Sequence, residues 1–161
     1  MNILDPAFEP VARFLHVAGA TMLIGAGAGI AFFMVMARRT RNPALIAHVA
    51  QSVVVADFLF TATAVVAQPI TGLWLAWLIG WPLTEPWLLA SILLYVMIGL
   101  FWLPVVFIQM RLRDLARQAA MAGTPLPEQF DRLYRIWFVC GWPAFAGVLV
   151  ILWLMTARPG F

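Results

Sequence analysis

The amino-acid sequence predicts an all-α fold, a bundle of four transmembrane helices with both termini on the outer, periplasmic side. Hydrophobic residues make up 64% of the 161 residues and charged residues only 11%, and the mean hydropathy is +0.94. An ordinary soluble domain carries about a quarter charged residues. A fold of this size in water could not hide so much apolar surface, so we expect a lipid bilayer around the chain.

The apolar residues form four continuous runs, each long enough to cross a hydrocarbon core as a helix. A transmembrane strand would alternate apolar and polar residues, which these runs do not. The predicted spans cover about residues 11–37, 50–79, 87–110 and 133–157 of a single domain, 1–161. The second run begins earlier, at Ala44, and Pro69 is expected to kink it. Residues 111–132 form the one long connection, which should continue the third helix and then break at Gly123.

Arginine placement predicts the orientation. All ten basic residues are arginines; three lie between positions 38 and 41 and five between 111 and 135, whereas the connection at 80–86 has none. Cytoplasmic connections are enriched in arginine, so the first and third connections, including 111–132, should be cytoplasmic. We therefore expect a multi-pass protein of the bacterial inner membrane. The arginines form no stripe that would follow a nucleic acid, and the first span lacks a basic leader and should remain in the mature protein.

His16 and Arg13 are the first candidates for a site, because they are three residues apart and share a face early in the first span. Imidazole is a common ligand of metals and of haem iron, and Arg13 is available for a haem propionate. His48 should lie near the opposite membrane surface, so the two histidines cannot hold one haem. The alternative for His16 is an interfacial residue that bonds a carbonyl group or water.

Gly19, Gln68 and Gly72 extend this candidate site. Gly19 follows His16 by nearly one helical turn, and its bare backbone would let a flat macrocycle lie against the helix; the alternative is close helix–helix packing. Gln68 and Gly72 flank Pro69 at about the depth of His16. A proline frees a backbone carbonyl that a neighbour or a ligand can use. These residues could form one polar cluster.

Asp57 is the one acidic residue expected within the hydrocarbon, in the cytoplasmic half of the second span. An ionisable group at that depth is costly and usually paired. We predict a structural ion pair between Asp57 and an arginine on the cytoplasmic side, with Arg135 as the first candidate. A proton relay, or a role beside a porphyrin propionate, is the alternative.

The segments FLHVAG at 14–19 and QPITG at 68–72, with the pair Arg38-Arg39, resemble a bacterial family of predicted integral membrane proteins of unknown function. The resemblance covers about residues 14–157. More distantly, the layout resembles HemJ-type protoporphyrinogen oxidases and CopD-type copper-resistance membrane domains, which share an early Leu-His pair and a Pro-x-x-Gly in the next span. The HemJ resemblance implies that His16 is an axial ligand of haem b. This chain has no lysine, unlike HemJ-type second spans, so the resemblance extends to haem binding rather than to protoporphyrinogen oxidation.

The leading functional hypothesis is an inner-membrane protein that binds haem b and has a redox or electron-transfer role. One alternative is a non-catalytic accessory or assembly subunit of a larger membrane complex, and another is a small-solute or copper permease. The expected partners are the lipid bilayer and either further copies of the chain or a larger membrane complex, with no nucleic acid.

Overall fold

The computed structural model describes residues 5–159, and these residues form helices joined by short connections. In chain order these are η1 (Pro6–Phe8), α1 (Glu9–Arg39), α2 (Pro43–Ala56), the π-helical η2 (Asp57–Ala62), α3 (Thr63–Ile79), α4 (Pro86–Ala122) and α5 (Glu128–Ala157). No strand occurs within residues 5–159. The predicted all-α class is confirmed.

Four stretches are long and apolar enough to cross a membrane, because α2, η2 and α3 run on as one helix, Pro43–Ile79. The other three are Pro6–Arg39, Pro86–Ala122 and Glu128–Ala157. The two stretches of 37 residues are about 55 Å long at about 1.5 Å per residue. They are longer than a hydrocarbon core of about 30 Å. Each also extends beyond the segment predicted to cross the membrane, 50–79 in one case and 87–110 in the other.

Local chemistry sets the helix ends. The side chain of Asn42 accepts hydrogen bonds from the Ala44 and Leu45 amides, and Pro43 occupies the first turn of α2. Gly80 and Gly123 end α3 and α4 with φ of +80° and +64°, a conformation that glycine adopts without strain. The predicted break of the third helix at Gly123 is therefore confirmed.

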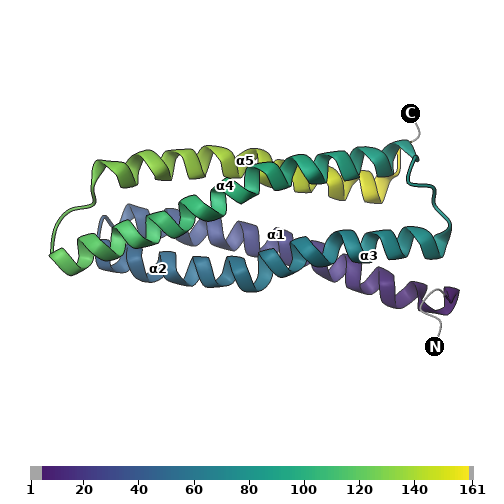
Figure 1. Cartoon of the computed structure of the whole chain (residues 1–161), viewed down its shortest axis with the longest axis horizontal. Coiled ribbons are helices and arrows are strands. Elements are labelled where there is room, and N and C mark those ends of the chain that lie inside the picture. Colours follow the sequence, from purple (N-terminus) through teal and green to yellow (C-terminus); the bar gives the residue numbers. More distant parts are fainter. Residues whose placement is uncertain (1–4, 160–161) are drawn as a thin grey trace.

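The bundle has two distinct ends (Figure 1). The arginine-rich end carries the α1–α2 turn and the α4–α5 connection. The terminal end carries both described chain ends and the α3–α4 loop. The helices follow one another round the bundle: α1 packs on α2 and α3, α2 on α4, α4 on α5, and α5 returns to α1.

The larger hydrophobic core lies toward the arginine-rich end. Met34, Ile46, Leu112 and Phe130 are fully buried there. A smaller core at the terminal end packs Trp87, Leu88 and Ala76. The central cavity described below borders the larger core, because Val105 and Trp137 belong to both.

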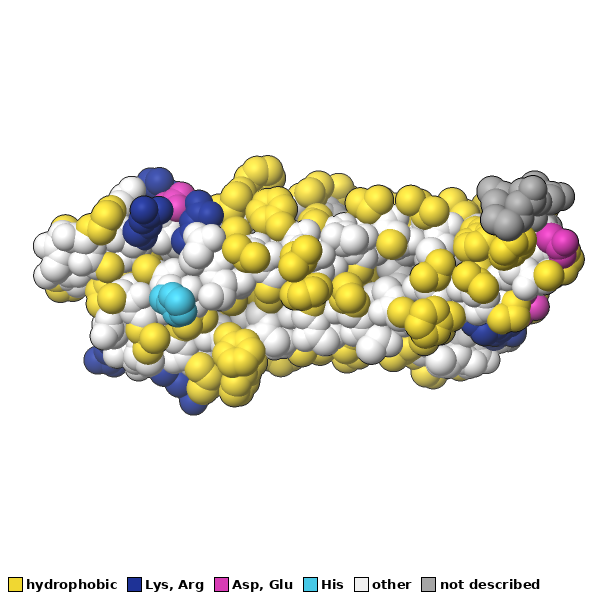
Figure 2. Space-filling model, turned by 90° about the horizontal axis from the view of Figure 1, so that it is seen from below, with side chains coloured by type: hydrophobic (Ala, Val, Ile, Leu, Met, Phe, Trp, Pro, Cys, Tyr) yellow, Lys and Arg dark blue, Asp and Glu magenta, His cyan; other side chains and the backbone are white. Residues whose placement is uncertain are grey.

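The apolar surface of the bundle is consistent with a surrounding lipid bilayer. Large exposed hydrophobic side chains occur along every spanning helix, for example Phe32, Ile70, Leu100 and Trp153. On the face drawn in Figure 2 the basic side chains gather mainly toward one end, and a long middle section carries no charged side chain.

Candidate functional site

His16, Gly19, Gln68 and Gly72 are neighbours where α1 packs on α3. The side-chain amide of Gln68 donates a hydrogen bond to the carbonyl oxygen of His16 at 2.8 Å. A Cβ on Gly72 would lie 2.9 Å from His16 Cε1, and a Cβ on Gly19 would lie 2.6 Å from Gln68 Nε2. Each glycine thus makes room for a polar side chain of the facing helix.

Thr71 decides which ring nitrogen of a neutral His16 carries the proton. The Thr71 hydroxyl donates its single hydrogen to the Ala67 carbonyl at 2.8 Å. It therefore accepts from His16 Nδ1, which is 3.1 Å away. With the hydroxyl hydrogen directed to Ala67, Nδ1 carries the proton and Nε2 keeps a lone pair, the arrangement in which histidine commonly binds metals.

The other features predicted for a haem at this place differ in the structure. The backbone at Gly19 and Gly72 is covered by Gln68 and His16, so it offers no bare surface for a macrocycle. Arg13 is not part of the cluster, because it forms an ion pair with Glu9 one turn earlier on α1. Within residues 5–159, no group of three or more His, Cys, Asp or Glu side chains is placed to hold a metal ion.

Pro69 frees the carbonyl of Val65, four residues earlier, because it has no N–H to donate. The Tyr95 hydroxyl of α4 donates a hydrogen bond to that oxygen. The freed carbonyl that the sequence predicted is therefore used by a neighbouring helix, and it ties α3 to α4.

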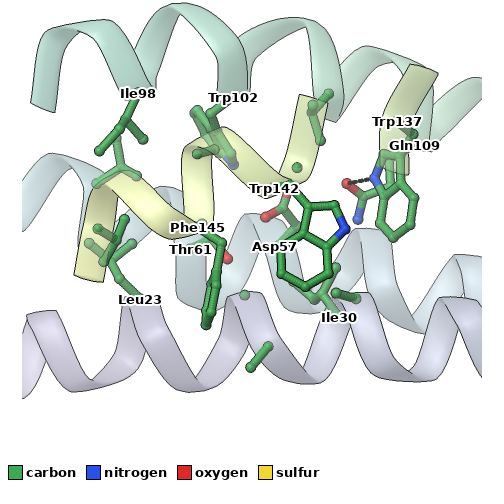
Figure 3. Close-up of a pocket in the computed structure, with 18 of the residues that line it drawn as sticks. Leu23, Ile30, Asp57, Thr61, Ile98, Trp102, Gln109, Trp137, Trp142 and Phe145 are labelled. Carbon is green, nitrogen blue, oxygen red and sulfur yellow. Dashed lines mark hydrogen bonds between the residues drawn. The ribbon is translucent and has the colours of Figure 1, made fainter. Parts of the chain in front are cut away.

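A second, larger candidate site is a cavity of about 360 Å³ in the middle of the bundle. Residues from α1, η2, α3, α4 and α5 line it, and they are mostly apolar. The side chains drawn in Figure 3 surround this space, and the larger ones include Leu23, Ile30, Ile98, Trp102, Trp142 and Phe145.

Three buried polar side chains lie within this apolar lining: Asp57, Thr61 and Gln109. The Asp57 carboxyl faces the Thr61 hydroxyl and the Trp102 indole. Gln109 Oε1 accepts a hydrogen bond from Trp137 Nε1 at 3.3 Å. Gln109 Nε2 has no hydrogen-bond partner among the described residues.

Asp57 is not paired with Arg135 in the part of the chain that the structure describes. The ion pairs there join Arg13 to Glu9, Arg38 to Asp131 and Arg113 to Asp114. Arg135 is exposed and is not among the residues that line the cavity. It therefore lies outside the space that Asp57 faces.

The π-helical segment η2 carries Asp57 and Thr61. The two residues are four apart and both buried, whereas Phe58, Leu59 and Phe60 between them are exposed. Residues four apart share a helix face, so the carboxyl and the hydroxyl both face into the bundle. Short π-helical turns often occur at functional sites.

Sequence reasoning singled out Asp57 but did not identify the cavity residues Thr61, Trp102 and Gln109. A usable signal was present: Thr61 lies four residues after Asp57, and Gln109 is an amide within an apolar run. Each side chain is a polar group at membrane depth. Such a group needs a hydrogen-bond partner inside the protein, just as an acidic side chain does.

Residues 10–159 match the model of one protein family, described as "Predicted integral membrane protein (DUF2269)". Comparison with curated proteins gives no match, and comparison with solved structures gives none either. The family match extends over nearly all of the four stretches that can cross a membrane.

Proposed function

This chain belongs to the family of predicted integral membrane proteins (DUF2269), and on that premise we propose that it binds a small, mainly apolar molecule inside the bilayer. The binding site is the central cavity of the bundle. The proposal develops the small-solute hypothesis drawn from the sequence, in preference to the haem hypothesis.

The observation that supports it is an apolar cavity in which the buried amide nitrogen of Gln109 has no hydrogen-bond partner among the described residues. The cavity volume of about 360 Å³ falls in the range of about 300–1,000 Å³ typical of small-molecule sites. Such sites combine apolar walls with a few polar groups that orient the ligand. A buried polar atom without a partner costs about 1–3 kcal/mol, so a ligand that bonds Gln109 Nε2 would recover part of this cost.

The test uses Nile red, a neutral apolar dye, with protein reconstituted in lipid nanodiscs. Gly141 lines the cavity, and a Cβ there would meet no atom within 4 Å. Gly141→Leu should therefore fill the cavity and remove saturable dye binding without unfolding the protein. Ala146→Leu is the matched control, because Ala146 is exposed on the same helix and does not line the cavity. Equal dye binding by wild type and Gly141→Leu would refute the proposal.

A second candidate function is haem b binding through Nε2 of His16, with a redox role. It is favoured by the Thr71 contact, which leaves Nε2 unprotonated, and His16 would then supply one axial ligand. The covered backbone at Gly19 and Gly72 weighs against it.

Absorption spectra of the oxidised and reduced protein test this second candidate. Haem binding through His16 predicts a Soret band after haem supplementation that is lost in His16→Ala. His48→Ala, which changes the exposed histidine on α2, should leave the band unchanged. A colourless preparation, or a His16→Ala variant with the wild-type spectrum, would rule the candidate out.

A further inference from the structure

We infer that the molecule bound in the central cavity is a lipophilic organic monocation, held by the Asp57 carboxylate and by the aromatic side chains around it. This inference rests on the proposed function and specifies the class of its ligand.

The charge balance of the cavity is the first argument. Asp57 is only 5% exposed, and none of the lining residues is an arginine or a histidine. An ionised carboxylate at membrane depth is costly unless an opposite charge compensates it. The arginines in ion pairs face Glu9, Asp131 and Asp114 instead. Residues 5–159 thus supply no counter-charge inside the cavity, and either a proton or a bound cation has to supply it.

The second argument is the aromatic lining of the cavity, which can bind an apolar cation. Trp102, Trp137, Trp142, Phe138 and Phe145 line the same space as Asp57. A cation over an aromatic face gains about 0.5–1 kcal/mol at an exposed site and about 2 kcal/mol when desolvated. A metal ion would require several oxygen or nitrogen ligands, whereas the cavity offers one carboxyl, and the Tyr95 hydroxyl and Gln109 Oε1 are already engaged in hydrogen bonds. A large organic cation matches both the walls and the single charge.

The buried polar atoms give the third argument. Thr61 Oγ1 lies beside the Asp57 carboxyl on the same helical segment. A hydroxyl oxygen and a carboxylate four residues apart can both accept from one cationic donor group. Gln109 Nε2, which has no partner among the described residues, is a donor available to an acceptor atom elsewhere on the ligand.

The site also implies competition between the cation and a proton. Among the lining residues the titratable groups are Asp57 and, on α4, Tyr95, whose hydroxyl is engaged with the Val65 carbonyl. The lining parts of α1 and α5 contribute no titratable side chain. Protonation of Asp57 removes the one negative charge, so cation binding should weaken as the pH falls.

Equilibrium binding of tritiated tetraphenylphosphonium to the protein in nanodiscs tests the inference. Tetraphenylborate has nearly the same shape with the opposite charge and is the matched probe. We expect saturable binding of the cation that is at least about tenfold tighter than that of the anion, a difference of about 1.4 kcal/mol. Asp57→Asn should abolish this preference, Asp57→Glu should retain part of it, and Glu85→Gln, in the α3–α4 loop, should leave it unchanged.

The outcomes separate this inference from the proposed function. Saturable Nile red binding that is lost in Gly141→Leu, together with no preference for the cation, would overturn the ligand class alone. Loss of the Nile red result as well would overturn both. If Asp57→Asn fails to fold, the comparison of cation and anion on the wild-type protein still decides, and equal affinity for the two probes would refute the inference.

Discussion

Pro69 leaves the Val65 carbonyl without its helical donor, and Tyr95 supplies the replacement. An unsatisfied carbonyl is most costly in a membrane, because no water is available to bond it. The Tyr95 hydroxyl, on another helix, therefore takes the place of the missing backbone N–H donor. It also lies at the edge of the cavity, which Tyr95 and Val65 both line.

Tyr95→Phe should lower the free energy of unfolding by about 1 kcal/mol, the usual scale of a hydrogen bond between membrane helices. In a Pro69→Ala background the loss should be smaller, because the backbone amide introduced at position 69 can then donate to the Val65 carbonyl. Unfolding in a mixed-micelle denaturant titration measures both effects as a double-mutant cycle. Additive effects of the two substitutions would show that Tyr95 does not replace the missing donor.

Gly72 and Gly29 form a second comparison at the residue scale. Gly72→Ala should destabilise the protein by about 1–3 kcal/mol, the usual cost of overpacking, because the new Cβ would meet the His16 ring at 2.9 Å. Gly29→Ala should be neutral or slightly stabilising, since a Cβ there would meet no atom within 4 Å and alanine favours helix. Thermal unfolding in detergent measures the difference, and equal melting temperatures would contradict the close contact.

Three of the spanning helices contain an irregular turn or a proline next to residues that line the cavity. The second span contains η2, while Pro104 and Pro143 interrupt the hydrogen bonding of α4 and α5 beside lining residues. Prolines and π-helical turns are the usual causes of local departures from straight helices. In this bundle three of the spanning helices depart from regular geometry at the level of the site.

Deletion of Leu59 tests the role of η2. Removing one exposed residue should convert the π-helical turn into regular α-helix while α2 and α3 keep their packing. We expect a folded protein with a modest loss of stability and weakened binding of tetraphenylphosphonium, because Asp57 and Thr61 would then be three residues apart and the spacing of their oxygen atoms would change. Circular dichroism and the binding assay measure the two properties. Unchanged binding would show that the π-helical turn does not position the site.

The whole molecule has a charge asymmetry that fits one orientation in a membrane. Both described chain ends and the α3–α4 loop share the terminal end (Figure 1), and eight of the ten arginines fall between positions 38–41 and 111–135, toward the other. The positive-inside tendency predicts that the arginine-rich end faces the cytoplasm. Its packed core around Phe130 and the Arg38–Asp131 ion pair would then stand at the cytoplasmic surface.

Cysteine labelling tests this orientation. Cys140 is the single cysteine, so a Cys140→Ser variant provides the background. Thr84→Cys, in the exposed α3–α4 loop, should react with a membrane-impermeant maleimide in intact spheroplasts. Thr124→Cys, in the exposed α4–α5 connection, should react only after permeabilisation. The reverse pattern would place the arginine-rich end outside.

The sequence by itself determined the surrounding lipid, the helical class and the four spans, because these depend on composition and on the length of apolar runs. It also indicated His16, Gly19, Gln68 and Gly72 at one depth, since residue position along a helix gives depth directly. Only the tertiary structure decided how the helices turn toward one another. Lipid-facing and interior surfaces are equally apolar, so hydrophobic periodicity could not tell that Asp57 faces aromatic side chains and a cavity while Arg135 faces outward.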